Sequence, residues 1–317
     1  MSRLEIISKF FLALASTVVL MISGTVIPPA GVILIPFVPQ PVLSFGIRYG
    51  AGWGAGVLGA AFLLLFLFAG AELAFIYLIF ALMASLLFGL LGRLRVIEWL
   101  VLSVASVVFA ALVGFLFCLY GSWSVMLQDL RSSLTEHMAA AVRVQEKMGF
   151  AQDTTEVLKE RLPAIAETML QVLPGLVFVS LSLIVLLNIL FLCRRFPDRR
   201  EEWLTVDNLR EWNAPEPLVW GLIICGFSLF ISGPEFLHTL AVNLLLVIAA
   251  CYFFQGLAIV AYFFHKSRVP YFLRMVTYAL IIFQQIFTLL VVGLGLFDLW
   301  GDFRRLKKKD LNPSQVS

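Results

Sequence analysis

The sequence has little charge, and its longest apolar stretches have none. Charged residues make up 14% of the chain and hydrophobic residues 61%. Phe10–Ile27, Leu73–Leu91 and Val172–Leu192 contain no Asp, Glu, Lys or Arg. About 20 residues of helix, at about 1.5 Å each, cross a hydrocarbon core of about 30 Å. Because a backbone amide in lipid must find its partner within its own helix, these stretches predict membrane-spanning helices.

The sequence also lacks the motifs of common enzymes. It contains no GxSxG, no HExxH, no Walker loop and no pair of carboxylates inside an apolar stretch. The three histidines, His137, His238 and His265, stand far apart. We therefore predict no catalytic residue, no metal site and no cofactor, and we expect the protein not to be an enzyme. A proton relay is not expected either, because relays place carboxylates or histidines at depth.

Paired cysteines and long basic blocks are missing as well. The four cysteines form no CxxC pair, which excludes the usual zinc and redox motifs. No basic block is long enough, or sufficiently interleaved with aromatic residues, to indicate nucleic acid as a partner. The partner that the composition predicts is the lipid bilayer.

What the chain does have is a series of apolar stretches that predicts an all-α, polytopic membrane helix bundle. The N-terminal stretch resembles a signal peptide, but it is too long and lacks an A-x-A site, so we expect an uncleaved first span. We place eight full spans, with nine as the alternative. The stretches considered are 10–27, 31–47, 51–69, 72–92, 97–119, 172–193, 217–233, 237–264 and 271–297.

The positions of Lys and Arg predict the orientation in a bacterial inner membrane, because cytoplasmic loops carry the excess of both. Arg3 places the N-terminus in the cytoplasm, and Arg48 and Arg93 mark the next two cytoplasmic hinges. The loop 194–216 is also rich in arginine. These assignments agree only if the proline-containing stretch 31–47 crosses the membrane.

The C-terminal end presents a conflict. Lys266 and the basic tail 304–317 both indicate the cytoplasmic side, whereas a full span at 271–297 would separate them. Gln284 and Gln285 lie in the middle of that stretch, where a break would turn the chain back. We therefore favour a re-entrant segment and a cytoplasmic tail, and the ninth span remains the alternative.

The charge and apolar pattern divide the chain into membrane parts at 1–120 and 172–303, a tail at 304–317, and an insert at 121–171. Within the insert, apolar residues recur every three or four positions, which predicts amphipathic helices. Acidic residues outnumber basic ones there, which favours the outer face. We expect a helical hairpin that lies on the membrane or packs over the bundle, with a surface open to a partner.

Uncharged polar residues and prolines at depth are the candidate ligand-binding groups. Their side chains suit hydrogen bonds to an uncharged solute or, equally, to a neighbouring helix. Prolines break the helix 31–47, and broken membrane helices line cavities or are buried in protein. The candidates are Pro36, Pro39, Asn243, Gln255, Gln284 and Gln285.

A glycine series predicts close packing between helices. Gly50 and Gly54, and likewise Gly52 and Gly56, are four residues apart and would share a helical face. Small residues at this spacing let a second helix approach closely, as in GxxxG packing.

The end of the last apolar stretch, GLGLFDLWGDFRRLKKKD, is the most distinctive string. On a helix, Asp298, Asp302 and Arg305 share one face, so we expect Asp302 and Arg305 to pair. Trp300 and Phe303 lie on the opposite, apolar face, with Trp300 suited to the headgroup level.

This string resembles the C-terminus of the YybS-like family of uncharacterised bacterial membrane proteins. The matching residues are Asp298, Trp300, Asp302, Phe303 and Arg304. Gln255 and Gly256 match a recurrent Gln-Gly of that family, and PVLSFGIRYGAGWGAG matches with Pro41, Arg48, Gly50 and Gly54.

The resemblance covers nearly the whole chain and implies a membrane fold without an assigned activity. The proline-then-glycine region is also similar to the substrate-binding subunits of energy-coupling-factor vitamin transporters and to MreD. Those transporter subunits have about six spans and no large insert, whereas this chain has both more spans and the insert 121–171.

Two functions follow as hypotheses. In the first, the protein is a small-solute binding or transport component, and active transport would need a separate ATPase module because no nucleotide motif is present. In the second, the protein is a non-enzymatic scaffold that binds an envelope protein through 121–171 and its basic surfaces.

Overall fold

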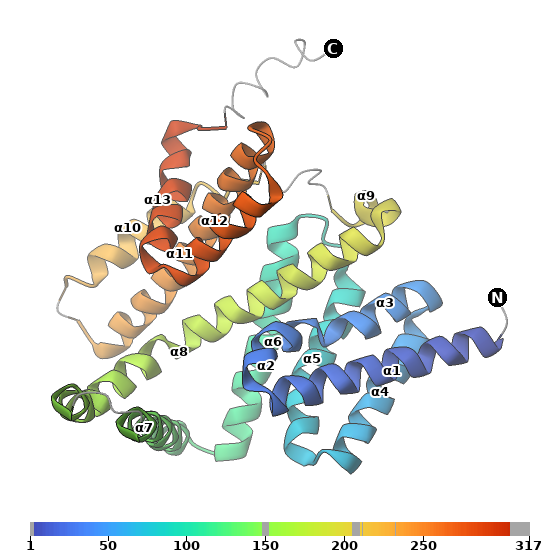
Figure 1. Cartoon of the computed structure of the whole chain (residues 1–317), viewed down its shortest axis with the longest axis horizontal. Coiled ribbons are helices and arrows are strands. Elements are labelled where there is room, and N and C mark those ends of the chain that lie inside the picture. The colour runs from blue at the N-terminus through green and yellow to red at the C-terminus, as the bar shows by residue number, and fades with distance from the viewer. Residues whose placement is uncertain (1–2, 148–151, 205–209, 211, 232, 305–317) are drawn as a thin grey trace, which may run out of the picture. The chain divides into compact units, whose positions relative to one another are not determined.

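The computed structural model describes residues 3–147, 152–204, 210, 212–231 and 233–304. These residues lie in helices and short connections, and no strand occurs among them (Figure 1). Several of the helices are apolar and of bilayer length. The prediction of an all-α polytopic membrane bundle is confirmed.

Within the described residues, seven stretches are long and apolar enough to cross a membrane, and the bent pair α12 (Tyr271–Phe283) and α13 (Gln285–Gly301) makes eight if it forms one span. The upper number equals the eight full spans predicted, but the two sets differ, because the prediction counts 217–233 and treats 271–297 as re-entrant. The seven stretches are Arg3–Val26, Ala30–Tyr49, Ala51–Phe68, Ala71–Leu90, Ile97–Tyr120, Arg161–Arg195 and Glu235–Lys266.

The chain forms two compact units, each described here by itself. The first unit consists of Met1–Met126 with Ser180–Thr205, and the second consists of Leu127–Val179 with Val206–Ser317. The helices of the first unit are α1 (Arg3–Val26), α2 (Pro28–Leu34), α3 (Pro39–Tyr49), α4 (Ala51–Phe68), α5 (Ala71–Leu90), α6 (Ile97–Tyr120), α9 (Arg200–Trp203) and the end of α8 (Gln152–Arg195). The second unit contains most of α7 (Trp123–Lys147), the start of α8, α10 (Leu218–Ser228), α11 (Glu235–Lys266), α12 and α13.

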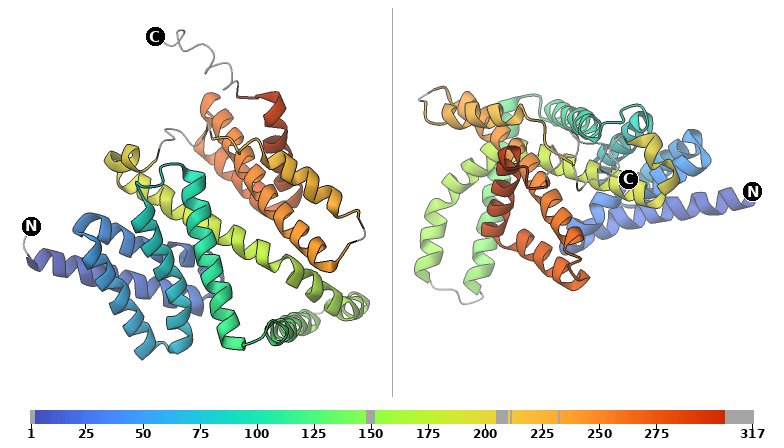
Figure 2. Two further views of the ribbon diagram at one scale, coloured as in Figure 1. Left: turned by 180° about the vertical axis from the view of Figure 1, so that it is seen from behind. Right: turned by 90° about the horizontal axis from the view of Figure 1, so that it is seen from above.

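The core of the first unit forms where α1, α3, α4 and α5 pack together. In both views of Figure 2 the blue helices α1, α3 and α4 lie side by side. Met21, Val57 and Tyr77 are almost completely buried in this core. The chain turns from α3 into α4 at Gly50, whose φ of 107° is a conformation that glycine adopts without strain.

The stretch 31–47 is helical but interrupted, as its prolines predict. A turn of 3-10 helix at Ile35–Phe37 separates α2 from α3. Pro36 has no N–H to donate and therefore cannot continue the α-helical ladder. The stretch Ala30–Tyr49 nevertheless counts as one apolar segment of bilayer length.

The helix predicted over 217–233 is shorter in the structure. The helix α10 ends at Ser228 and has 11 residues, or about 16 Å, which is less than the bilayer length of the other apolar helices. The Ser228 hydroxyl donates to the Cys225 carbonyl, and the chain turns at Phe230 before Gly233 and Pro234. Because proline cannot continue a helix, the next helix begins only at Glu235.

The second helix of the predicted hairpin is not separate from the predicted span 172–193. Instead α8 runs unbroken from Gln152 to Arg195, through Pro163 and Pro174. Its 44 residues are about 66 Å long, roughly twice the thickness of the hydrocarbon core. Part of α8 therefore extends beyond the hydrocarbon, as expected for the insert, while the limits of the insert remain predictions.

Candidate functional site

The second unit is built around a very close crossing of α11 and α13. A Cβ atom on Gly256 would collide with the Val291 carbonyl, and one on Gly295 would collide with the Tyr252 carbonyl. Only glycine at both positions allows this approach, which is the physical basis of small-residue packing in membranes. The crossing brings Gln255, next to Gly256, beside Asp298, one turn after Gly295.

Asp298 ends α13 by accepting hydrogen bonds from three directions. Its Oδ1 accepts from the Phe303 amide at 2.8 Å, and its Oδ2 accepts from Gln255 Nε2 at 3.3 Å and from Arg304 Nη2 at 2.7 Å. Asp302, which lies between Asp298 and Arg304 in the sequence, adopts the left-handed conformation, with φ 38° and ψ 52°. This turn reverses the chain after α13 and brings the Arg304 side chain back to the Asp298 carboxylate.

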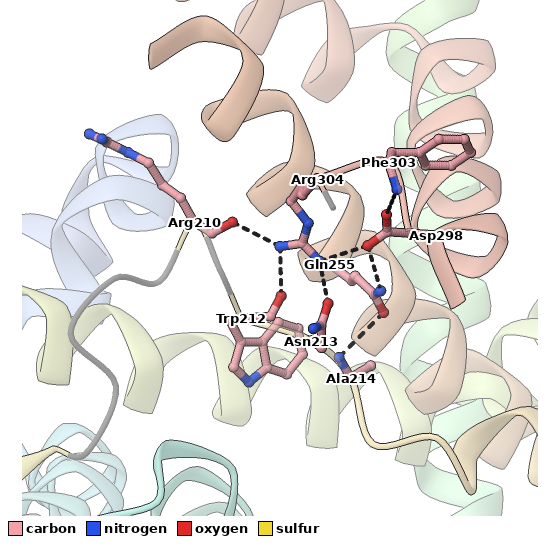
Figure 3. A network of polar contacts seen from close by, with 8 residues as sticks. All are labelled: Arg210, Trp212, Asn213, Ala214, Gln255, Asp298, Phe303 and Arg304. Atoms are coloured by element: carbon pink, nitrogen blue, oxygen red, sulfur yellow. Dashed lines mark hydrogen bonds and ion pairs between the residues drawn. The ribbon is translucent and has the colours of Figure 1, made fainter. Parts of the chain in front are cut away.

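Arg304 connects the end of α13 to the segment before α10 (Figure 3). Its Nη1 donates to the carbonyls of Arg210 at 2.8 Å and Trp212 at 3.0 Å. Its Nη2 donates to the Asn213 side-chain oxygen as well as to Asp298. Five N–H groups in a rigid fork suit a guanidinium to this kind of multiple contact. We call the set Gln255, Asp298 and Arg304 with the segment 210–214 the arginine network.

Gln255 completes the arginine network from α11. Its Nε2 donates to Asp298, while its Oε1 accepts from the Ala214 amide at 3.3 Å. Figure 3 shows the Gln255 amide between the Asp298 carboxylate and the backbone of Ala214. The segment before α10 is therefore held by α11 and by Arg304 at once.

The arginine network is buried and almost fully hydrogen-bonded. The side chains of Arg304 and Asp298 are 0% and 4% exposed, and Gln255 is 2% exposed. Among the buried side-chain atoms of the network, only Arg304 Nε lacks a hydrogen-bond partner within the described residues. Chemically this arrangement can hold segments together, and the Asp298 carboxylate and the Gln255 amide are already engaged in hydrogen bonds.

The structure brings together three residues of the C-terminal string. Asp298, Phe303 and Arg304 meet in the network, and Asp302 supplies the turn. The string is not one continuous helix, because α13 ends at Gly301, and Asp298 forms an ion pair with Arg304. The predicted pair of Asp302 and Arg305 includes a residue outside the described ones and stays a prediction. Trp300 is 66% exposed, as its predicted place at the headgroup level requires.

Asn243 joins α11 to α8. Its Oδ1 accepts from the Gly175 amide at 2.5 Å, and its Nδ2 donates to the Gln171 and Thr239 carbonyls at 2.7 Å each. Gly175 has no side chain to separate the two helices, since a Cβ there would lie 2.7 Å from Asn243 Oδ1. Asn243 therefore uses both ends of its amide for contacts with α8, and it also bonds to the preceding turn of α11.

In the first unit, Pro36 and Pro39 lie beside a polar pair that sequence reasoning missed. Asn188 Nδ2 donates to the Pro36 carbonyl at 2.8 Å, and Gln40 Nε2 donates to Asn188 Oδ1 at 2.9 Å. Pro39 is buried next to Gln40. The signal for this pair was the presence of two amides in apolar stretches, but their separation of 148 residues hid the contact.

Gln284 and Gln285 lie at a sharp break in the second unit. The axes of α12 and α13 differ by 100°, and Gln284 is the extended residue between them, with φ −109° and ψ 107°. Both glutamines are exposed. The Thr288 hydroxyl donates to the Ile281 carbonyl at 2.5 Å and so satisfies one acceptor at the break.

The four glycines of the predicted packing face have different roles. Gly54 lies in close contact with Gly46 of α3, since a Cβ on Gly54 would be 3.2 Å from the Gly46 Cα. Gly56 faces the Phe10 ring of α1, with 3.4 Å to the same hypothetical atom. Gly52 has open space around it, and Gly50 forms the turn before the helix.

No group of three or more His, Cys, Asp or Glu side chains that could hold a metal ion occurs within the residues the structure describes. Among the described residues, the arginine network contains no histidine or cysteine.

A helical bundle with seven or eight bilayer-length apolar segments is a polytopic α-helical membrane protein. Residues 15–299 match the model of the family described as predicted membrane protein (DUF2232), and the chain belongs to this family. Searches of curated proteins and of solved structures found no match.

Proposed function

We propose that this protein is a small-solute binding or transport component of the bacterial inner membrane and is not an enzyme. The observation that supports this proposal is the 100° break between α12 and α13, where Gln284 and Gln285 are exposed in the middle of an apolar segment. Discontinuous membrane helices of this kind form the solute sites of many secondary transporters.

A break in a membrane helix needs polar groups or water beside it. Neither exposed glutamine side chain forms a hydrogen bond with the described residues. Lipid offers no donor or acceptor to the amides or to the unwound backbone, so such a break requires protein or a water-filled cavity beside it. We infer that Gln284 and Gln285 face a polar cavity and supply the hydrogen bonds to an uncharged solute.

The other candidate ligands take a different role in this proposal. The amides of Asn243 and Gln255 are engaged with backbone groups or with Asp298, so they position helices around the solute path. The interrupted segment at Pro36 in the first unit is a second break whose freed carbonyl already has a protein partner, Asn188.

The proposed orientation places the C-terminal tail and the loop 194–216 in the cytoplasm. Arg304 bonds to the carbonyls of Arg210 and Trp212, so the start of the tail and this part of the loop lie at the same end of the second unit. Both segments are basic, which supports the cytoplasmic side.

Gln255 lies 20 residues after Glu235, about 30 Å along α11 and so about one hydrocarbon thickness.

This spacing supports a position for Glu235 on the outer face and a re-entrant α12–α13 pair. Lys266 lies further along α11 than Gln255, on the same side of the membrane as the arginine network. In this proposal α12 starts and α13 ends on that side, so the pair enters and leaves at one face, in agreement with the basic character of both Lys266 and the tail.

Transport against a gradient would need a separate energy source. We propose a separate ATPase module as partner, in line with the resemblance to energy-coupling-factor substrate-binding subunits. The YybS-like resemblance is compatible with this role.

The proposal is tested by ligand-dependent thermal stability of the purified protein against a panel of uncharged and zwitterionic metabolites. A ligand that binds the folded state raises stability by about 2.7 kcal/mol at a hundredfold excess over its Kd. We expect at least one metabolite to raise Tm, and Gln284→Leu with Gln285→Leu to remove that rise. Gln128→Leu, an exposed glutamine on α7, is the control. A rise that persists in the double variant contradicts the proposed site.

A scaffold is the second candidate function, and α7 favours it. This 25-residue helix is not among the membrane-crossing segments, yet Trp123, Leu127 and Val144 are about half exposed. An amphipathic helix with such a face lies on a membrane surface or against another protein. Absence of any metabolite effect, together with a stable envelope protein that co-purifies only when α7 is unaltered, would favour the scaffold.

A further inference from the structure

We propose that the first unit binds an anionic phospholipid at a defined site, with one acyl chain in an apolar cavity between α3, α4 and α5 and the phosphate beside Arg48 and Arg93. This site lies within the first unit and is independent of the solute site proposed above.

The cavity is suited to hydrocarbon. It has a volume of about 190 Å³ and is lined almost entirely by apolar groups, and the hydroxyl of Ser85 is already bonded to the Ala81 carbonyl at 2.8 Å. An apolar cavity of about 150 Å³ in a protein core stays dry and accepts small hydrocarbons. The residues that define it include Val42, Gly46, Gly54, Ala55, Ala84 and Phe88.

Small residues on α3 and α4 create this space. Gly46 and Gly54 approach closely, while the Phe88 ring of α5 lies 3.4 Å from where a Gly46 Cβ would be. Ala55, which lines the cavity next to Gly54, is exposed. The hollow therefore lies beside the close contact of two backbones and the Phe88 ring, and it opens at Ala55 to the surroundings of the bundle.

Two arginines lie at the same end of this cavity. Arg48 follows Gly46 by two residues and Arg93 follows Phe88 by five, and the contact between Phe88 and Gly46 places the ends of α3 and α5 together. Both arginines are exposed, and neither forms an ion pair or a side-chain hydrogen bond with the described residues. Arg95, two residues later, instead donates to the Glu201 carbonyl.

Charge complementarity selects the occupant. Arg48 and Arg93 are two of the residues that assign this end to the cytoplasmic side, where the leaflet carries anionic lipid. Basic sites between membrane helices on this side bind lipid phosphates. A zwitterionic lipid would use the cavity without the charge, and free phosphate would use the charge without the cavity. Only an anionic phospholipid uses both.

The test measures Tm of the purified full-length chain in detergent with added phosphatidylglycerol, phosphatidylcholine of the same acyl chains, or inorganic phosphate. We expect phosphatidylglycerol to give the largest saturable rise. The variant Arg48→Gln with Arg93→Gln should reduce that rise to the phosphatidylcholine level. Ala55→Phe, which fills the cavity from its exposed side, should reduce the rise with either lipid.

Two matched variants control for general effects on charge and packing. Arg143→Gln removes an exposed arginine on α7, and Leu63→Phe enlarges an exposed residue of α4 outside the cavity. Both should respond to lipid as the wild type does. Equal rises with the two lipids, an equal rise with inorganic phosphate alone, or an undiminished preference for phosphatidylglycerol in the arginine variant would each overturn the proposal.

Discussion

At the scale of single residues, Arg304 shows how a charge is kept inside this protein. Its side chain is completely buried, and it is surrounded by two carbonyls, the Asn213 side chain and the Asp298 carboxylate. A buried ion pair is costly to desolvate, and the cost is offset only when further hydrogen bonds satisfy both ions. The Phe303 amide and Gln255 provide these bonds for Asp298.

Arg304→Gln should therefore destabilise the protein by about 3–5 kcal/mol, because it leaves the Asp298 carboxylate buried without its counter-ion. Asp298→Asn should have an effect of the same sign, and the double variant should lose less than the sum of the two single losses. Denaturant titration of the purified protein measures all three variants.

The exposed pair of Arg131 and Glu167 serves as the control for this prediction. Its side chains are 58% and 42% exposed, so Arg131→Gln should change stability by about 0–1 kcal/mol. Equal losses for Arg304→Gln and Arg131→Gln would show that the arginine network does not stabilise the fold.

At the scale of helices, the crossing of α11 and α13 determines whether the network can form. The backbone of each helix occupies the space that a side chain at Gly256 or Gly295 would take. The contact depends on the absence of two Cβ atoms, and it sets the distance between Gln255 and Asp298. A small change at the crossing should therefore also disturb the polar contacts beside it.

Gly295→Ala should cost about 1–3 kcal/mol because the added methyl group meets the Tyr252 carbonyl and forces the helices apart. Gly293→Ala, on the same helix with open space around it, should leave Tm unchanged or raise it, since alanine favours a helix. Thermal unfolding in one detergent compares the two variants directly. Similar Tm values would contradict the close crossing.

At the scale of the whole molecule, the membrane orientation is the property from which the proposed roles follow. The basic loops, the arginine network and the length of α11 support one arrangement, with the tail and the loop 194–216 in the cytoplasm. In the proposed arrangement, a re-entrant α12–α13 pair brings two glutamines into the membrane from the cytoplasmic side.

Cysteine labelling tests this orientation in a variant that lacks the four native cysteines. Asp198→Cys in the loop and Ser314→Cys in the tail should react only with reagents that enter the cytoplasm. Glu235→Cys should react with a membrane-impermeant maleimide added to intact spheroplasts. Labelling of Ser314→Cys from outside would show that α12 and α13 complete a full span.

The sequence by itself determined that lipid surrounds the apolar stretches, that the fold is helical, and that the segment 31–47 is broken. These follow from local composition, because a bilayer-length apolar stretch must be helical and a proline cannot donate to the helical ladder. Gln284 and Gln285 also marked the later break, where two adjacent amides interrupt an apolar segment. The end of α10 was missed because the apolar pattern continues past Ser228 although the helix does not.

Only the tertiary structure decided which polar residues meet. Asn188 reaches Gln40 across 148 residues, and Gln255 reaches Asp298 across 43. From the sequence alone, each of these amides could equally bind a solute or contact a neighbouring helix. Pairing of this kind depends on which helices cross and how closely, and that depends on glycines far apart in the chain. Arg304 became a buried anchor for the same reason: the turn at Asp302 directs it inward, whereas its basic neighbourhood indicated a solvated tail.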